Sequence, residues 1–598
     1  MVEPVCSTPE QAWRYLRLIR RSDEAKRLCD WLDEHTGPMS RCSGEVLLLA
    51  MFLAAEIKSS YLRSQLCAVI NGLDATILFD IGLCDPKQFT PVSYSSVVRQ
   101  VRRLETAPFT ELMEAALGKG AAPNHGPGAD AGLLWFNQGL LLGSVPKQVL
   151  TRIKVGAVDA TAFATNARVT DFRRQADVDK MLRDSLINST PLPDGLIVGQ
   201  DGKIQRCKAD PEARTSVRGA SRATGHKQSY FTGYFGTIVA ASPDRRDYPD
   251  PNKDIPPERD IGPYVLSFSL DPATVNRAPV GRDVVLSLKK ALPRLDLIVA
   301  DREFTTRSDF VRPLHEADID IIMDYTVTTK ERPTIVRVGR RREPLYLSCG
   351  DFFPLWMPER FLVPPDPSFS SQETADWAED RAKYRYVRNG KSKGGTIQFR
   401  CPQCAGNVIG AANTRTGPFR KGKRRHLKGI PALGPPFPVQ WCCNGTINIR
   451  ADELDQWQPE SWATEMHRRI YGAGRSRIEN ANGIVKHEGG MDPRACEASG
   501  VRPHSMALLA LAVANNVTRA DADVCADPPT DDVPEAEPSL FCVTSALHSN
   551  GSGNGTGNGT GTGTGNGSAP DTNTGTGNGS APDTNTGAEK VPALRAPP

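Results

Sequence analysis

A row of charged and polar side chains near residue 480 has the composition of a phosphoryl-transfer site. If the chain is helical from Arg475 onward, Arg475, Glu479 and Lys486 fall on one stripe together with Asn482, because a helix turns about 100° per residue. A carboxylate flanked by cations suits such chemistry, since the carboxylate binds a metal and the cations bind phosphate. Taken alone, the pattern favours a solvated helix face with an ion pair.

Two aspartates further upstream each follow a short apolar run that is typical of a buried strand. Asp159 follows residues 154–158, and Asp301 follows residues 295–300. Open α/β sheets place their chemistry at the C-terminal ends of strands, so the two carboxylates converge if these strands are neighbours. With Glu479 they would form an oxygen-rich set suited to Mg²⁺ or Mn²⁺. Either aspartate considered singly is more simply a loop or cap residue.

The elements around these aspartates predict a mixed α/β sheet with helices on its faces. Strands are expected at residues 154–158, 230–241, 264–270, 295–300 and 320–323, and helices at 281–292, 306–317 and 503–517. Three strands followed by alternating helices and strands indicate a mixed five-stranded sheet. Residues 172–228 are polar and are expected to be irregular.

The N-terminal residues 1–118 predict an all-helical region. A short helix is followed by a basic helix that carries Arg99, Arg102 and Arg103, an order compatible with helix-turn-helix reading of DNA. An ordinary helical bundle with a basic surface explains the pattern more simply. Residues 119–149, which begin with a stretch rich in Gly, Pro and Ala, are expected to form a linker.

Residues 327–460 differ in texture, being β-prone, basic and rich in Pro and Gly. They lie between Asp301 and Glu479, so we expect a β-rich insertion in the sheet domain, which resumes at 461–520. Their densest basic run suits the phosphate backbone of DNA, and a solvated loop explains it about as well. The cations of that run expected to contact DNA are Arg420, Lys421, Arg424 and Arg425.

Four cysteines of the insertion have the spacing of an incomplete zinc site. They form two pairs, Cys401 with Cys404 and Cys442 with Cys443. The first pair is half of a zinc knuckle. Adjacent cysteines rarely ligate one ion together, and His426 could substitute for one of them. The sequence leaves structural Zn²⁺ and free thiols open, with free thiols the simpler alternative.

Composition excludes some functions without naming a ligand. The 598 residues are enough for three to four domains, and a net charge of +4 leaves any case for DNA binding to local clusters. The most apolar run, residues 46–55, is too short to span a bilayer. We expect a cytoplasmic protein with no membrane contact and with most of its 14 cysteines reduced. Residues 521–598 predict a disordered tail rich in Gly, Asn and Thr.

The row near residue 480 resembles the Tyr-Arg-Glu-Lys signature of bacterial insertion-sequence transposases of the DDE class. Its members are Tyr471, Arg475, Glu479 and Lys486, with one residue more between the tyrosine and the arginine than the signature has. Other stretches resemble the family's two aspartate motifs and the segment before its second strand. They are residues 159–161, 300–302, 210–214 and 225–227, with Tyr234. Glu303 stands where a glycine is common.

The resemblance, which covers about residues 150–520, implies an RNase H-like catalytic core in two parts. These parts are residues 150–326 and 461–520. It implies that the carboxylates of Asp159, Asp301 and Glu479 hold two Mg²⁺ ions for in-line displacement at a phosphodiester.

The family's remaining signature residues imply contacts with DNA. Arg475 and Lys486 would bind phosphates at the cleaved end, and Tyr471 would stack or hydrogen-bond there. The partners implied are double-stranded DNA, as terminal inverted repeats and target, and a second copy of the chain. The implied location is bacterial and nucleoid-associated.

Two alternatives remain open on the sequence alone. An RNase H-like nuclease would use the same carboxylates to cut DNA without joining it. A domesticated DNA-binding protein would have no use for three metal-binding carboxylates, which argues against that alternative.

Overall fold

A computed structural model describes most of the chain between residues 8 and 526. The described residues are 8–34, 41–57, 63–85, 88–89, 91–118, 130–165, 196–198, 204–206, 210, 212–218, 229–247, 260–304, 307–325, 330, 333–339, 342–355, 357–365, 370–391, 396–405, 446–487 and 500–526.

The described part of the N-terminal region is mainly helical. Its helices are α1 (Pro9–Arg21), α2 (Asp23–Glu34), α3 (Gly44–Glu56), α4 (Arg63–Asn71), α5 (Ala75–Asp80), α6 (Tyr94–Glu105) and α7 (Phe109–Leu117). The first begins as its sequence dictates, since Thr8 forms a capping box with Gln11 and Pro9 follows directly. Two short strands, β1 (Cys84–Asp85) and β2 (Gln88–Phe89), pair between α5 and α6. The expectation of an entirely helical region is therefore wrong at this point.

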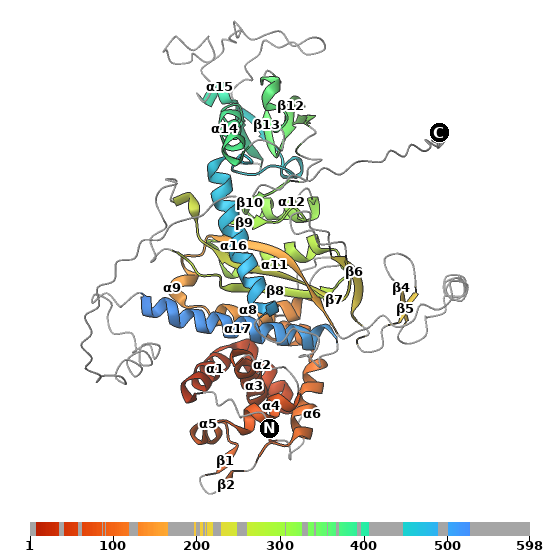
Figure 1. Ribbon diagram of the computed structural model, residues 1–598, viewed down its shortest axis with the longest axis vertical. Helices are drawn as coiled ribbons and strands as arrows, with labels where there is room; N and C mark the ends of the chain where they lie inside the picture. Colours follow the sequence, from red (N-terminus) through yellow and green to blue (C-terminus); the bar gives the residue numbers. More distant parts are fainter. Residues whose placement is uncertain are drawn as a thin grey trace, which may run out of the picture. The chain divides into compact units, whose positions relative to one another are not determined.

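A mixed sheet, six-stranded over the described residues, lies in the middle of the chain (Figure 1). Its strands are β3 (Val155–Ala164), β6 (Arg214–Arg218), β7 (Ser229–Ser242), β8 (Val265–Pro272), β9 (Leu297–Ala300) and β10 (Asp320–Met323). Their order is β10-β9-β3-β7, and both β6 and β8 pair with the other edge of β7. β9 and β10 run parallel to β3, whereas β7 is antiparallel to β3, β6 and β8. The five expected strands are present, which confirms the mixed α/β class. β6 adds a strand within a segment expected to be irregular, and β4 (Leu196–Val198) pairs with β5 (Ile204–Arg206) nearby in sequence.

The pairing register brings Asp159 and Asp301 to one place in the sheet. Val158 of β3 pairs in parallel with Ala300 of β9, so the residues that follow them are neighbours. β9 ends there, whereas β3 continues to Ala164 because β7 pairs with its whole length. The apolar run predicts that Asp159 follows the end of its strand. This prediction is wrong, because Asp159 lies inside β3.

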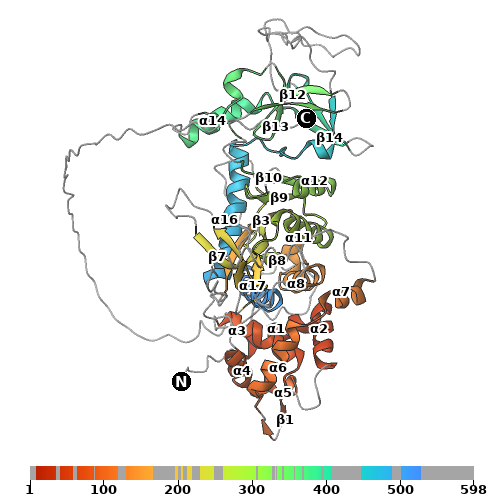
Figure 2. The same ribbon diagram turned by 90° about the vertical axis from the view of Figure 1, so that its right-hand side faces the viewer.

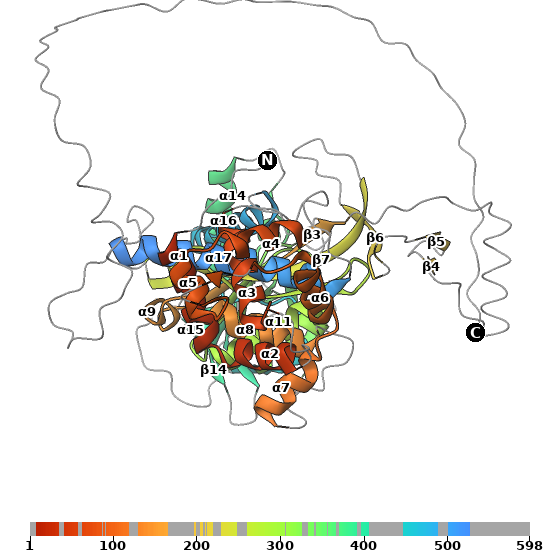
Figure 3. The same cartoon turned by 90° about the horizontal axis from the view of Figure 1, so that it is seen from below.

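Helices cover both faces of the sheet (Figure 2). They are α8 (Ala131–Gly143), α9 (Lys147–Leu150), α11 (Arg277–Ala291), α12 (Ser308–Glu316), α16 (Glu465–His487) and α17 (Val501–Ala526). Side chains of α11 and α12 share a core with Val158 and Ile298, on one face. Side chains of α16 and α17 share a core with Ala157 and Val299, on the other face. The second core continues into the N-terminal helices, whose α3 packs against α17 (Figure 3).

The expected linker is shorter than its composition suggested. Asp130 caps α8 by accepting a hydrogen bond from the backbone N–H of Leu133 at 3.0 Å. The apolar run that follows is buried, so residues 131–150 belong to the packed structure, and 119–129 lie outside the described residues. α17 likewise runs into the expected tail, of which 527–598 lie outside the described residues. Along the described stretches, no helix is long and apolar enough to cross a bilayer.

The described part of the insertion is rich in β-structure, as expected. One sheet consists of β11 (Thr334–Val338), β12 (Glu343–Ser348) and β13 (Asp351–Phe353), and another of β14 (Val387–Lys391), β15 (Ile397–Arg400) and β16 (Thr446–Ile449). Helices α14 (Ser371–Ala382) and α15 (Pro402–Ala405) accompany them, with short 3₁₀ turns at Glu359–Phe361 and Ala451–Glu453. Another 3₁₀ turn, Arg245–Asp247, follows β7 outside the insertion. Val338, Phe352, Phe399 and Trp457 belong to a separate core of the insertion.

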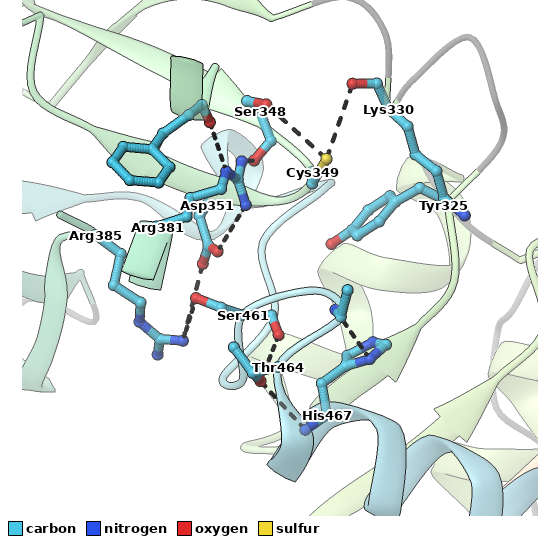
Figure 4. Close-up of polar contacts among 12 residues, drawn as sticks. Tyr325, Lys330, Ser348, Cys349, Asp351, Arg381, Arg385, Ser461, Thr464 and His467 are labelled. Carbon is cyan, nitrogen blue, oxygen red and sulfur yellow. Dashed lines mark hydrogen bonds and ion pairs between the residues drawn. The ribbon is translucent and has the colours of Figure 1, made fainter. Parts of the chain in front are cut away.

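A buried polar network joins the insertion to the segment that enters α16 (Figure 4). Arg381 of α14 is fully buried and donates to two backbone oxygens of the insertion, at 2.6 and 3.0 Å. Its Nη1 lies 3.8 Å from the carboxylate of Asp351. Arg385 donates to the hydroxyl of Ser461 at 3.0 Å, just before α16 begins. The start of α16 is therefore fixed by contacts from the insertion as well as from the sheet.

Candidate active site

α16 packs closely on the sheet because a glycine faces β9. A methyl group at Gly474 would lie 2.6 Å from Cβ of Val299, well inside contact distance. The packing face of the helix also includes Ile470, Ile478 and Val485, all buried. The stripe of charged residues lies about 100° round the helix from this face and not opposite it. It therefore borders the sheet, where the aspartates are.

Asp159 faces α16 from β3. It is two residues from Ala157 and four from Phe163, so it lies on the same face of β3 as these two residues, which belong to the core shared with that helix. Its side chain is 14% exposed, and the Asn482 side-chain amide of α16 donates to its Oδ2 at 2.9 Å. Burial raises the pKa of Asp159, and the carboxylate of Asp301 raises it further, while the Arg475 guanidinium opposes the shift.

Asp301 lies on a tight turn directly after β9. Its backbone carbonyl accepts from the N–H of Phe304 at 2.9 Å, and its Oδ1 accepts from the N–H of Arg302 at 2.7 Å. The hydroxyl of Tyr471 donates to the same Oδ1 at 3.5 Å. Because α16 already includes Tyr471, the extra residue in the spacing places it one turn before Arg475, on the same stripe.

The Tyr471 ring is held from behind by a buried histidine. His467 stacks on it with ring centroids 5.8 Å apart and an angle of 7° between the planes. Nε2 of His467 lies 3.1 Å from the backbone oxygen of Met323 at the end of β10. Burial lowers the pKa of His467 to about 4, and burial followed by the Asp301 charge raises that of Tyr471.

Arg475 contacts all three predicted carboxylates. Its Nη1 lies 3.6 Å from Asp159 and 3.3 Å from Asp301, and its Nη2 donates to Glu479 at 2.9 Å. Burial lowers the pKa of Arg475, but Asp159 and Asp301 outweigh it and the net shift is upward. Lys486, on the same stripe, lies near enough for its charge to lower the pKa of Asp159. The fold thus brings together the three predicted acids and, beside them, Tyr471, Arg475 and Lys486.

A fourth carboxylate and a second arginine belong to this region, and the sequence did not predict their roles. Burial raises the pKa of Glu303, and the charges of Asp159 and Asp301 add to the shift. Arg277, at the start of α11, donates to Oε2 of Glu303 at 2.6 Å. Its guanidinium also lies 3.9 Å from the centroid of the Phe235 ring. The signal in the sequence was Glu303 itself, two residues after Asp301.

The donor set suits a hard divalent cation, but the side chains are not arranged around one. The carboxylates offer only oxygen, as Mg²⁺ or Mn²⁺ requires. Among the described residues, no group of three His, Cys, Asp or Glu side chains is placed to hold a metal ion. The guanidinium of Arg475 is the cation that the three acids share.

Other predicted residues lie away from this site or outside the described residues. Cys401 is buried, and α15 includes Cys404, whose side chain is not described. The remaining predicted zinc and basic-run residues also fall outside the described residues. They are Cys442, Cys443, His426, Arg420, Lys421, Arg424 and Arg425.

The segment at 210–214 has a different task from the acids of the site. The hydroxyl of Tyr234 on β7 donates to the buried carboxylate of Asp210 at 2.7 Å. The N–H of Gly500 donates to the same carboxylate at 3.1 Å. Asp210 thereby ties β7 to the start of α17.

Comparisons with known proteins do not place this chain in a family. No model of a known protein family matches it, and no curated protein does.

Proposed function

We propose that this chain is a DDE transposase, which cleaves and joins DNA at the ends of an insertion sequence by metal-dependent phosphoryl transfer. The observation that carries the proposal is the convergence of Asp159, Asp301 and Glu479 on one guanidinium. Three acids from a strand, the turn after a second strand and a remote helix have no structural need to meet, since their mutual repulsion is costly. Their meeting is typical of a site built to bind a divalent cation.

The fold supports an RNase H-like core. The strand order is β8-β7-β3-β9-β10, with three antiparallel strands followed by two parallel ones, so β3 and β9 are neighbours and the carboxylates of Asp159 and Asp301 can serve one site. The β-rich insertion stands between Asp301 and Glu479, where the resemblance requires it. The acids lie at the edge of the sheet where β9 ends.

The roles of the residues follow from their positions. Asp159, Asp301 and Glu479 would hold Mg²⁺, which, when bound, activates the attacking oxygen and stabilises the leaving oxygen. Asn482 orients the Asp159 carboxylate through its amide.

The cations of the stripe would act on the nucleic acid. Arg475 and Lys486 present their charges beside the acids, where they would bind phosphates of the cleaved strand. Tyr471, held by His467, keeps its hydroxyl at Asp301. Two element ends must be joined in concert, so the active form we propose is a homodimer on terminal inverted repeats and target DNA.

The test uses labelled duplexes with the DNA that flanks the reading frame, a target plasmid and Mg²⁺. We expect Asp301→Asn to lower cleavage and joining by roughly a thousandfold while end binding changes little. Asp309→Asn, in α12 and removed from the row, serves as the matched control and should keep full activity. Joined products support a transposase, and nicks without joining support the nuclease alternative. Full cleavage by Asp301→Asn would exclude this site as the catalytic one.

A further inference from the structure

Arg475 is a poorly fitted partner for the carboxylates it neutralises. Its Nη1 is buried and forms no hydrogen bond to the described residues, but lies 3.3 and 3.6 Å from two aspartates. Arginines nearby make much tighter pairs. Arg477, on the same helix, donates from the single nitrogen Nη2 to both oxygens of Asp260 at 2.7 Å. Elsewhere in the described chain, Arg312 donates from Nε and Nη2 to the two oxygens of Asp455, also at 2.7 Å. Such a two-nitrogen fork is the stable form of an arginine–carboxylate pair, and Arg475 does not form it with either aspartate.

The charges at the site do not balance. Three carboxylates contact one guanidinium, and Lys486 is the further cation whose charge acts on Asp159. The acids therefore retain negative charge and an attraction for a divalent ion. With Arg475 in place, however, the described acids provide no arrangement that holds a metal. The guanidinium and a divalent cation thus compete for the same carboxylates.

A ready alternative exists for the guanidinium. Arg475 lies on the stripe that borders solvent, its side chain is 23% exposed, and its flexible stem allows the head to turn outward. A phosphate offers two oxygens on one phosphorus, which match the planar fork of a guanidinium as the two separate aspartates do not.

We infer that Arg475 is an exchangeable counter-ion, and this inference rests on the proposed function. It neutralises the acids while the protein is free, and it moves to a DNA phosphate when DNA enters, which opens the carboxylates to the divalent cation. DNA and metal then bind with positive coupling, and thermodynamic reciprocity requires each to strengthen the other equally. Arg475 holds the site closed to metal until a strand is present.

The test measures Mn²⁺ binding to the full chain from the signal of free Mn²⁺ in electron paramagnetic resonance, without DNA. We expect Arg475→Gln to bind Mn²⁺ at least about tenfold more tightly than the parent, because a competing positive charge is removed. Arg475→Lys should fall between them, since one ammonium cannot contact three carboxylates at once. Arg477→Gln, two residues further on the same helix, is the control and should bind as the parent does.

The coupling is measured by fluorescence anisotropy of a labelled duplex with and without Mn²⁺. The parent and Arg477→Gln should bind DNA more tightly with Mn²⁺, and Arg475→Gln should lose most of this gain. Circular dichroism establishes that each variant is folded, and Arg475→Lys keeps the test open if Arg475→Gln is not. Unchanged or weaker Mn²⁺ binding by the folded variants overturns the exchange, even if the parent cuts and joins DNA. A parent that never cuts DNA, with tighter Mn²⁺ binding by Arg475→Gln, removes the proposed function and keeps the exchange.

Discussion

At the scale of single residues, the site contains a buried carboxylate whose ionisation is unfavourable. Asp159 is the most buried of the three acids, with its side chain 14% exposed against 26% for Asp301 and 62% for Glu479. Burial is also the largest cause of its raised pKa. Keeping such a group ionised costs folding free energy, as is common where a residue is retained for chemistry.

Replacing Asp159 by Asn should stabilise the metal-free protein at neutral pH by on the order of 1 kcal/mol. The folded-state pKa of Asp159 is raised, so ionisation costs more in the folded chain than in the unfolded chain. The parent therefore loses folding stability as pH rises from the ordinary pKa of an aspartate to the raised pKa of Asp159 in the folded chain, and the variant does not. Urea unfolding in a chelator at several pH values measures the difference, which should narrow towards acid pH. A variant less stable than the parent at every pH would contradict the assignment.

The sequence predicted the principal residues because their relation is local. The i, i+4, i+7 and i+11 spacing of the row on α16 needs only helical geometry. The apolar run before each aspartate indicated a buried strand that ends close to it. Glu303 and Arg277 escaped because their contact joins a turn to the start of α11, and that distance is set by the folded sheet. The contact between these two residues depends on tertiary structure, so no periodic pattern in the sequence indicates it.

At the scale of elements, the approach of α16 to β9 sets the reach of its side chains. The helix lies close because Gly474 has no side chain against Val299. Arg475 follows directly and contacts acids on both β3 and the turn after β9. The contact of Gly474 could not be predicted from the sequence, because a glycine within a helix usually indicates only a loss of helix propensity.

Gly474→Ala should destabilise the protein by about 1–3 kcal/mol and reduce phosphoryl transfer, because the added methyl pushes α16 away from the sheet. Gly472 lies on the same helix with open space around its Cβ position, so Gly472→Ala should stabilise by roughly 0.5–1 kcal/mol. Thermal unfolding compares the two variants directly. Equal effects of both would show that the contact with Val299 is easily relieved.

The outward face of α6 carries the basic side chains on which the helix-turn-helix interpretation depends. Ser95, Arg99 and Arg102 are exposed on one stripe, while Val97 and Leu104 are buried on the opposite side. This agrees with the basic helix of the helix-turn-helix interpretation, which stays a prediction.

Arg99→Ala combined with Arg102→Ala should weaken duplex binding about tenfold at moderate salt and reduce the salt slope of log affinity by about 2. Arg21→Ala with Lys26→Ala removes two exposed cations from α1 and α2 and should have a smaller effect. Fluorescence anisotropy over a salt series in a chelator separates this binding from catalysis. Equal losses in the two double variants would indicate a diffuse electrostatic effect without a reading helix.

At the scale of the whole described molecule, fold class was predictable and connections were not. The five strands of the expected sheet are apolar runs, so burial on both faces marked them. β6 carries Arg214 and Arg218 and becomes a strand only because β7 is long enough to pair with it beyond β8. The sequence predicts a linker where α8 lies, because the Gly- and Pro-rich stretch before the helix dominates the local composition.

The network of Figure 4 gives a measurable link between the insertion and the rest of the chain. Asp351→Asn should cost about 3 kcal/mol, because Arg381 is fully buried and loses its carboxylate. Adding Arg381→Met should recover part of that loss, as a double-mutant cycle by urea unfolding would show. Asp380→Asn, in an exposed pair with Lys383, is the control and should change stability by less than about 0.5 kcal/mol. A loss for Asp351→Asn no larger than this would mean that the pair is not needed for stability.

The insertion between β10 and α16 also imposes an order in time. A ribosome releases the strands with Asp159 and Asp301 well before it has made α16, so the growing polypeptide holds the two acids without their guanidinium. Under the proposed function, no chain interrupted within the insertion can act on a chromosome. A product that ends before α16 has neither Glu479 nor Arg475, so under the proposed function it would not cut the chromosome.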